Sequence, residues 1–133
     1  MSTAGTGHFE GKSWEEKPYS EVEGGQKLTH THVTNAFRGD IEGEGTLEYL
    51  TIYHADGTAS FFGLERVVGR IGNRSGSFVL KHSGTFEGGT AKTNWFVIPG
   101  SGTGDLRSLR GDGGFIARHG QLQTAYTLDY DFE

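Results

Sequence analysis

Glu65 and His82 are the two side chains of this sequence best suited to acid–base chemistry. Both lie in segments of alternating apolar residues, with Val67 two positions after Glu65 and Leu80 two positions before His82. A carboxylate in apolar surroundings is costly unless it is paired, and a histidine can supply the pairing. In a cavity, such a pair can act as general base and general acid, which typically contributes about 10²–10⁴ in rate. The alternative is a structural hydrogen bond that ties two strands together.

The segments that carry these residues have the composition of β-strands. Runs rich in Thr, Val, Phe, Tyr and Ile alternate with glycine-containing turns, and helical periodicity is confined to a short segment at 105–110. Long strands with short connections favour sequential antiparallel pairing, and closing the sheet removes its edges. We therefore predict an all-β fold, an eight-stranded antiparallel up-and-down barrel that forms a single domain over residues 1–133. The predicted strands cover 5–15, 27–38, 43–54, 58–71, 76–87, 90–99, 112–119 and 122–132.

Three turns predict how the central strands are aligned. They are a three-residue loop that ends in Gly57, a loop over 72–75, and a two-residue turn at Gly88 and Gly89. Together they predict one cross-strand row on a single face, because a slip of one residue in any turn would move part of the row to the other face. The residues of the predicted row are Leu47, Glu65, His82 and Trp95.

The face that carries this row is predicted to be the lumen, and it is rich in aromatic side chains. As a ligand-binding wall they would combine apolar surface with a few hydrogen-bonding groups, whereas as ordinary core they need no ligand. Tyr53 and Trp95 are favoured as ligand contacts because each ring has a polar tip. The candidate ligand-binding residues are Tyr49, Tyr53, Phe61, Phe78, Trp95 and Tyr126.

The opposite face also carries apolar side chains on two adjacent strands. An exposed apolar patch of this kind usually marks a contact surface. We therefore expect either another subunit or the segment 105–110 to cover it, and favour a homo-oligomer. The residues concerned are Leu50, Ile52, Phe62, Leu64 and Val68.

Composition and motifs exclude several other classes of function. The chain has no cysteine, which removes disulfides, thiolate catalysis and cysteine-based zinc sites, and its net charge of −5 argues against a nucleic-acid partner. No apolar run is long enough to span a membrane and residues 1–6 show no secretion signal, so a soluble, cytoplasmic protein is expected. His30 and His32 could join His54 in a metal site, but the predicted strand turns both outward, and we expect no metal.

A glycine-rich segment at 100–104 lacks the Lys-Ser/Thr of a phosphate-binding loop. We expect it to be a tight loop that leads into a short helical turn at Asp105.

Five segments of the chain together resemble a bacterial domain family of unknown function. They are Lys12–Tyr19, Gly39–Thr46, Gly63–Val67, Gly76–Phe86 and Pro99–Gly104. That family is similar to a compact version of the allene oxide cyclase and dirigent barrels. The resemblance implies a barrel with a lumen for hydrophobic small molecules; some barrels of this kind catalyse cyclisations without a cofactor, and others are templates or binders. It supplies no catalytic residues that can be transferred to this chain.

Two functions therefore stay open for a lumen that takes a hydrophobic small molecule. One is a cofactor-free cyclase or isomerase in which Glu65 and His82 are the acid–base pair. The other is a non-catalytic binder, or a barrel filled by its own side chains. The volume of the cavity separates a ligand site from a filled barrel, because ligand sites measure about 300–1,000 Å³.

Overall fold

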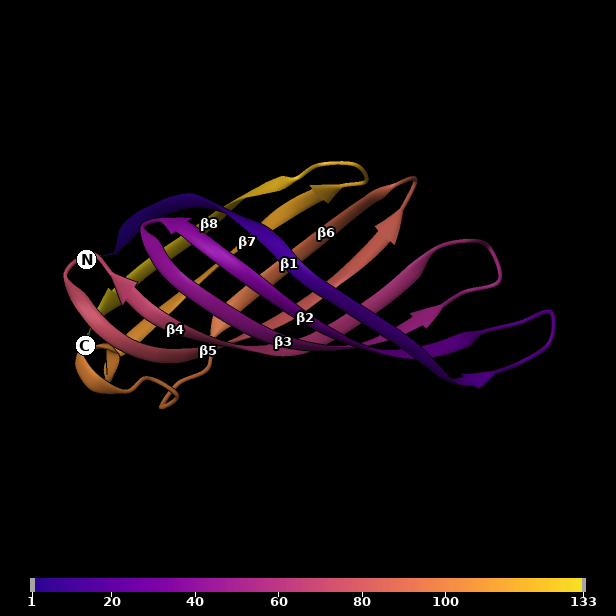
Figure 1. The fold of residues 1–133 in the computed structure, drawn as a ribbon, viewed down its shortest axis with the longest axis horizontal. Helices are drawn as coiled ribbons and strands as arrows, with labels where there is room; N and C mark the ends of the chain where they lie inside the picture. Colours follow the sequence, from indigo (N-terminus) through magenta and orange to yellow (C-terminus); the bar gives the residue numbers. More distant parts are fainter. Residues whose placement is uncertain (1, 133) are drawn as a thin grey trace.

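The computed structural model describes residues 2–132, which form a closed eight-stranded antiparallel barrel (Figure 1). Each strand pairs with its sequence neighbours, and β1 closes the barrel by pairing with β8. This confirms the predicted all-β architecture. The strands are β1 (Thr3–Glu21), β2 (Lys27–Gly39), β3 (Ile41–Tyr53), β4 (Ala59–Ile71), β5 (Arg74–Glu87), β6 (Thr90–Val97), β7 (Leu109–Arg118) and β8 (Gln123–Phe132).

The helical segment is shorter than predicted. A 3₁₀ turn, η1 (Gly104–Leu106), takes the place of the expected turn at 105–110, and β7 begins three residues before the predicted start. The glycine-rich segment before it runs alongside β5, where the amide of Ser77 donates to the Thr103 hydroxyl at 3.0 Å. Among the described residues no helix is long and apolar enough to cross a membrane.

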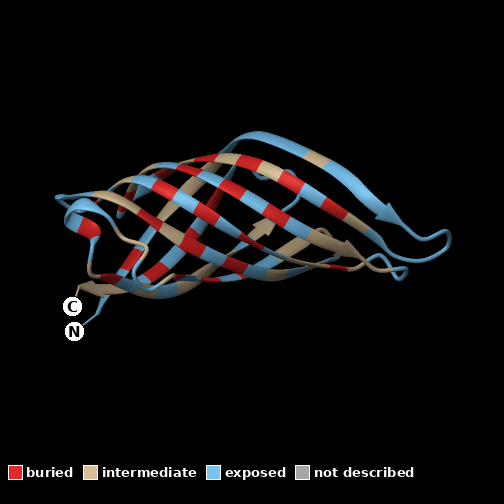
Figure 2. Cartoon of the chain, turned by 90° about the horizontal axis from the view of Figure 1, so that it is seen from below, coloured by how far each residue is buried: buried red, intermediate tan, exposed pale blue. Residues whose placement is uncertain are grey.

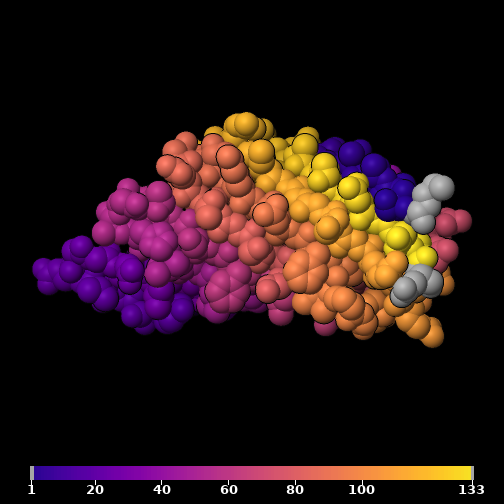
Figure 3. Space-filling view, turned by 180° about the vertical axis from the view of Figure 1, so that it is seen from behind, coloured from indigo at the N-terminus to yellow at the C-terminus, as the bar shows by residue number. Residues whose placement is uncertain are grey.

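The two ends of the barrel differ. β1 pairs with β8 only as far as Glu10, and from there to Glu21 it pairs with β2 alone. The β1–β2 hairpin therefore projects beyond the other turns (Figures 1 and 3), and its tip is exposed on all sides (Figure 2). The predicted first strand, 5–15, missed this extension because no core pattern marks a hairpin that leaves the barrel.

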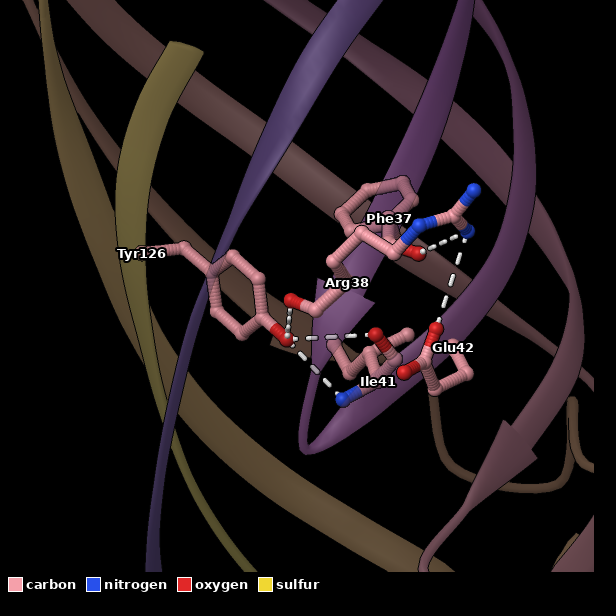
Figure 4. Close-up of polar contacts among 5 residues, drawn as sticks. All are labelled: Phe37, Arg38, Ile41, Glu42 and Tyr126. Atoms are coloured by element: carbon pink, nitrogen blue, oxygen red, sulfur yellow. Dashed lines mark hydrogen bonds and ion pairs between the residues drawn. The ribbon is translucent and has the colours of Figure 1, made fainter.

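The opposite end, near the termini, is closed by a packed core. Tyr126 reaches across from β8 to the β2–β3 turn, where its hydroxyl accepts from the amide of Ile41 at 2.9 Å and lies 3.1 Å from the carbonyl of Arg38 (Figure 4). Gly7 leaves room for that ring, since a Cβ there would lie 2.4 Å from the Tyr126 hydroxyl. Leu106 of η1 is fully buried in the same core.

The register is confirmed in two of the three predicted turns and wrong in the third. Leu47 faces Glu65 and His82 faces Trp95, as predicted. The β4–β5 turn has two residues rather than four, because Gly72 adopts a φ of 61° and closes a tight hairpin that pairs Ile71 with Arg74. The error is therefore two residues, which leaves every side chain on the predicted face.

The outward apolar residues of β3 and β4 are exposed as predicted. Phe62, Leu64 and Val68 keep 51–58% of their surface accessible, and Leu50 keeps 40%. Ile52 is half-buried. We call these five residues the β3–β4 patch. It continues across the sheet, because Leu64 neighbours Lys81 and Lys81 neighbours the exposed Phe96.

We expect the β3–β4 patch to hold two copies of the chain together. We expect the wild type to form a dimer or larger oligomer by light scattering at micromolar concentration, and replacing Phe62 and Leu64 by Ser should make it a monomer, because large exposed apolar patches mark contact surfaces. Leu122→Ser is the matched control, since Leu122 is 83% exposed and lies outside the patch. A wild-type protein that stays monomeric would contradict the prediction.

Candidate functional site

A cavity of about 650 Å³ occupies the end of the barrel from which the β1–β2 hairpin projects. Three of the predicted aromatic residues line it, namely Tyr49, Tyr53 and Phe61. Much of the remaining wall is also apolar: Phe9, Trp14, Val33, Leu47, Phe86 and Phe115. The predicted lumen face is thus the wall of a real cavity.

The other three predicted aromatic residues lie in the packed core and do not line this cavity. Phe78, Trp95 and Tyr126 keep at most 2% of their surface accessible. The indole of Trp95 donates to the carbonyl of Thr127 at 2.9 Å. Trp95 also lies edge-on against the His82 ring, with centroids 5.2 Å apart, so it supports the cavity floor from below.

Glu65 is completely buried between β3 and β5, and both its carboxylate oxygens receive hydrogen bonds. His82 Nε2 lies 2.8 Å from Oε1, and the Asn35 side-chain amide donates to Oε2 at 2.9 Å. His82 is the diagonal neighbour of Glu65, because it lies two residues along β5 from Leu80, the residue directly opposite Glu65. The two predicted acid–base residues are therefore in contact inside the barrel.

His82 joins this carboxylate to Tyr49. Its other ring nitrogen, Nδ1, lies 3.2 Å from the Tyr49 hydroxyl. A carboxylate only accepts hydrogen bonds, so Nε2 carries the hydrogen toward Glu65, and in the neutral ring Nδ1 accepts from the tyrosine. Burial raises the pKa of Tyr49 well above its usual value, and the nearby Glu65 charge raises it further. Tyr49 is thus a neutral phenol at ordinary pH, ready to donate.

Two glycines make room for the hydrogen-bonded network of Asn35, Glu65, His82 and Tyr49, which we call the Glu65 network. Gly45 leaves room for the carboxylate, since a Cβ there would lie 2.2 Å from Glu65 Oε2. Gly63 lies between Tyr49 and His82 in the cross-strand row, and a Cβ there would lie 3.0 Å from the Tyr49 ring. The side chains therefore meet across positions that have no side chain of their own.

The mouth of the cavity is shaped by a β-bulge in β1. The pairing with β2 shifts between Gly11 and Ser13, so Lys12 is the extra residue. Before the bulge Phe9 and Gly11 line the cavity, and after it Trp14 does. A bulge reverses which side chains face inward, and bulges of this kind often lie beside functional sites.

The same reversal brings Glu16 to the β2–β3 side of the mouth. Its Oε2 accepts from the hydroxyls of Tyr53, at 2.5 Å, and Thr29, at 2.7 Å. Partial burial and the hydrogen bond to Glu16 together raise the pKa of Tyr53 to about 12.

The histidines considered as metal ligands lie elsewhere. His30 and His32 point outward, where both contact the carboxylate of Glu48, and His54 Nε2 lies 3.3 Å from the Ser60 hydroxyl. Burial raises the pKa of Glu48, but the hydrogen bonds from the two histidines outweigh it and lower that pKa. Over the described residues no group of three or more His, Asp or Glu side chains is placed to hold a metal ion.

Sequence reasoning missed Asn35 and Trp14 at this site. Asn35 alternates with the inward-facing Val33 and Phe37, so the strand pattern alone could have placed it in the lumen. Trp14 could not have been placed this way, because a strand without the bulge at Lys12 would turn it outward.

Comparison with known proteins matches this barrel to one family. Residues 5–130 match the family described as "Protein of unknown function (DUF3224)". The chain belongs to this family. A solved structure of a DUF3224 protein of unknown function from Shewanella oneidensis is similar along 100% of this chain and 98% of its own, with 30% sequence identity and a TM-score of 0.81. No curated protein matches.

The buried position of Glu65 and His82 predicts how substitutions affect stability. His82→Ala should lower the free energy of unfolding by about 3–5 kcal/mol, because it leaves a buried carboxylate without its imidazole partner. The double replacement of Glu65 by Leu and His82 by Phe should cost less, since no unpaired charge remains. Chemical denaturation measures both, with His119→Ala at an exposed position as the control. A His82→Ala protein as stable as the wild type would show that the pair is not buried in solution.

The raised pKa values of the tyrosines predict a loss of stability at alkaline pH. Phenols of the unfolded chain ionise near pH 10.0, whereas that of Tyr49 ionises higher and that of Tyr53 at about 12. The two protonated phenols therefore contribute fully to the free energy of unfolding below pH 10. This contribution is lost progressively as the pH rises through their pKa values in the folded state. Tyr49→Phe should flatten the decrease of Tm above about pH 10, while Tyr19→Phe, at a 60% exposed position, should not. If Tm falls equally steeply with pH in the two variants, the alkaline loss of stability does not come from Tyr49.

Proposed function

We propose that the lumen binds a hydrophobic small molecule, and that the protein isomerises or cyclises it without a cofactor. The single observation that supports this is the cavity of about 650 Å³, which reaches both the Tyr49 and the His82 rings. Its volume falls within the range of about 300–1,000 Å³ found for ligand sites. The resemblance to allene oxide cyclase and dirigent barrels points to the same class of function.

The cavity also offers a polar contact to a ligand. Thr93 lines the wall, and its hydroxyl is buried without a hydrogen-bond partner among the described residues. A buried hydroxyl without a partner carries a desolvation cost that a polar ligand atom would remove. An apolar wall with a few such groups is the usual composition of a small-molecule site.

In this proposal, Glu65, His82 and Tyr49 have different roles. Glu65 has no exposed surface and both its oxygens are occupied, so it acts through His82 as a positioning residue. His82 and Tyr49 line the cavity and can touch the ligand. The arrangement follows the logic of a catalytic triad, in which a carboxylate orients a histidine and stabilises its protonated form.

In the proposed step, a proton leaves an acidic C–H or O–H of the ligand and moves to the Tyr49 oxygen. The phenol proton passes at the same time to His82 Nδ1, and the resulting imidazolium is stabilised by the Glu65 carboxylate. The proton returns along the same path to another position of the ligand. No net proton or electron is gained or lost, as an isomerisation requires.

A non-catalytic binder is the second candidate, and the same cavity supports it. In that case the hydrogen bonds among Asn35, Glu65, His82 and Tyr49 are structural and fix the inner wall of the lumen. Both candidates bind a ligand and only one of them catalyses a reaction, so binding and catalysis are measured in separate experiments.

Binding is tested with the neutral fluorescent probe phenylnaphthylamine. We expect the wild type to enhance its fluorescence, and Ala91→Trp to abolish the enhancement because it fills the cavity that Ala91 lines. Phe62→Ser, on the outer β3–β4 patch, is the matched control and should bind as the wild type does. Enhancement that survives Ala91→Trp would place the probe outside the lumen and contradict the proposal.

Catalysis is tested by deuterium exchange from heavy water into the carbon beside the carbonyl of a hydrophobic cyclic ketone. We expect the wild type to accelerate exchange, and Tyr49→Phe and His82→Gln to reduce it about 10²-fold or more. Melting curves of each variant serve as the folding control. Equal exchange in the wild type and both variants would favour the binder.

A further inference from the structure

We infer that the ligand of this lumen is an amphipathic organic anion, whose charged group is held at the mouth by Lys12, Arg118 and His119. This inference rests on the proposed lumen site and adds the class of ligand that it takes. It is carried by the charges that line the cavity, by the opening in the barrel wall beside them, and by the few ion-pair contacts that these charges make among the described residues.

The charges at the cavity differ in sign from those of the whole protein. The chain has 17 acidic and 12 basic residues, with a net charge of −5. Among the described residues that line the cavity there is no aspartate or glutamate, yet Lys12, Arg118 and His119 all line it. The cavity wall is therefore basic in an acidic protein, which favours an anion entering it.

The three basic residues flank a break in the barrel wall. β8 lies between β1 and β7, and its pairing with β1 ends at the contact between Glu10 and Gln123. Lys12 follows two residues later on β1, while Arg118 ends β7 and His119 begins the turn to β8. The basic residues thus lie on the two strands that flank β8, at the end where the sheet is open, and all three line the cavity.

The bulge places Lys12 at this opening. A regular strand alternates its side chains, so the position after the inward-facing Gly11 would face outward. Lys12 is instead the extra residue of the bulge and lines the cavity. Bulges are over-represented beside functional sites, so an extra basic residue at the mouth of the cavity supports a site here.

The basic groups are free to bind a ligand. Over the described part of the chain, neither Arg118 nor His119 has an ion-pair partner, and Lys12 has only a 3.8 Å contact between its ammonium and the exposed Glu10. Glu16, which also lies near the mouth, is on the β2–β3 side with its Oε2 held by two hydroxyls. An arginine also suits a carboxylate, sulfonate or phosphate, because its planar fork donates two hydrogen bonds at once.

The cavity below these residues is apolar, so the anion must carry an apolar body. A small inorganic anion would leave that wall unoccupied, and a neutral hydrophobic molecule would make no use of the basic mouth. A single anionic group on a ring or chain fits both. The charged end would then sit at the mouth and the reacting end would lie near Tyr49 and His82.

The inference is tested with two fluorescent probes that share one aromatic body. Anilinonaphthalene sulfonate carries a negative charge, and phenylnaphthylamine is its neutral counterpart. We expect the sulfonate to bind the wild type more tightly, and Lys12→Gln with Arg118→Gln to weaken it about tenfold while leaving the neutral probe unchanged. Arg66→Gln with Lys92→Gln is the matched control, because it changes the net charge equally at outward, exposed positions. Only the signal that Ala91→Trp removes is counted as lumen binding.

The outcomes separate this inference from the proposed function. If both probes bind the lumen equally and the Lys12/Arg118 double variant changes neither, the anionic ligand is overturned and the hydrophobic lumen site stands. If the control pair weakens the sulfonate as much as the mouth pair, the effect is one of net charge and the inference is overturned. If neither probe binds the wild-type lumen, the proposed function fails, and the inference fails with it.

Discussion

A carboxylate that has no contact with solvent must be held by the protein, and the barrel is arranged around this requirement at Glu65. Four consecutive strands contribute, because Asn35 comes from β2, the gap at Gly45 from β3, Glu65 from β4 and His82 from β5. The Asn35–Glu65 contact passes over Gly45 and the Tyr49–His82 contact passes over Gly63, two positions where a side chain would collide. The glycines are therefore as necessary as the polar groups, and the result is a rigid polar line in an otherwise aromatic interior.

This polar line divides the barrel into two parts with different packing. On the side of the termini, aromatic and aliphatic side chains fill the interior, with Tyr126 tying β8 to the β2–β3 turn and Leu106 closing the end. On the side of the projecting hairpin, the side chains do not fill the interior, and the cavity lies between the strands. The hydrogen-bonded network of Asn35, Glu65, His82 and Tyr49 lies at the boundary. The His82 ring packs against Trp95 on one side of it, and the cavity lies on the other side. Tyr49 and His82 are therefore largely withdrawn from solvent and still line the cavity.

Strand composition, the alternation of apolar residues and the positions of the turns were enough to predict the barrel, its inner face and the contact between Glu65 and His82. The turn at Gly72 was predicted with two residues too many. A register error of two residues keeps every side chain on the same face, so the predicted site residues still face the lumen. The bulge at Lys12 is different, since one extra residue reverses the face, and no local signal in the segment marks it. The inner wall of the site could therefore be predicted from sequence, whereas its mouth could not. The packing of Trp95 and Tyr126 beneath the cavity also depends on barrel closure, which pattern alone does not specify.

Strand β1 is irregular where a regular barrel would be closed to a ligand. Strand β1 leaves β8 after Glu10, bulges at Lys12 and continues as a hairpin with β2 alone. A purely structural barrel would be more stable with β1 paired along its length and the lumen filled, because edge strands and empty volume both cost stability. Side chains of the projecting part instead turn toward the opening, with Trp14 against Tyr49 at a ring distance of 6.4 Å and Glu16 bound to Tyr53. The hairpin thus forms one wall of the entrance, and its departure from the barrel leaves the cavity open above Tyr49 and His82.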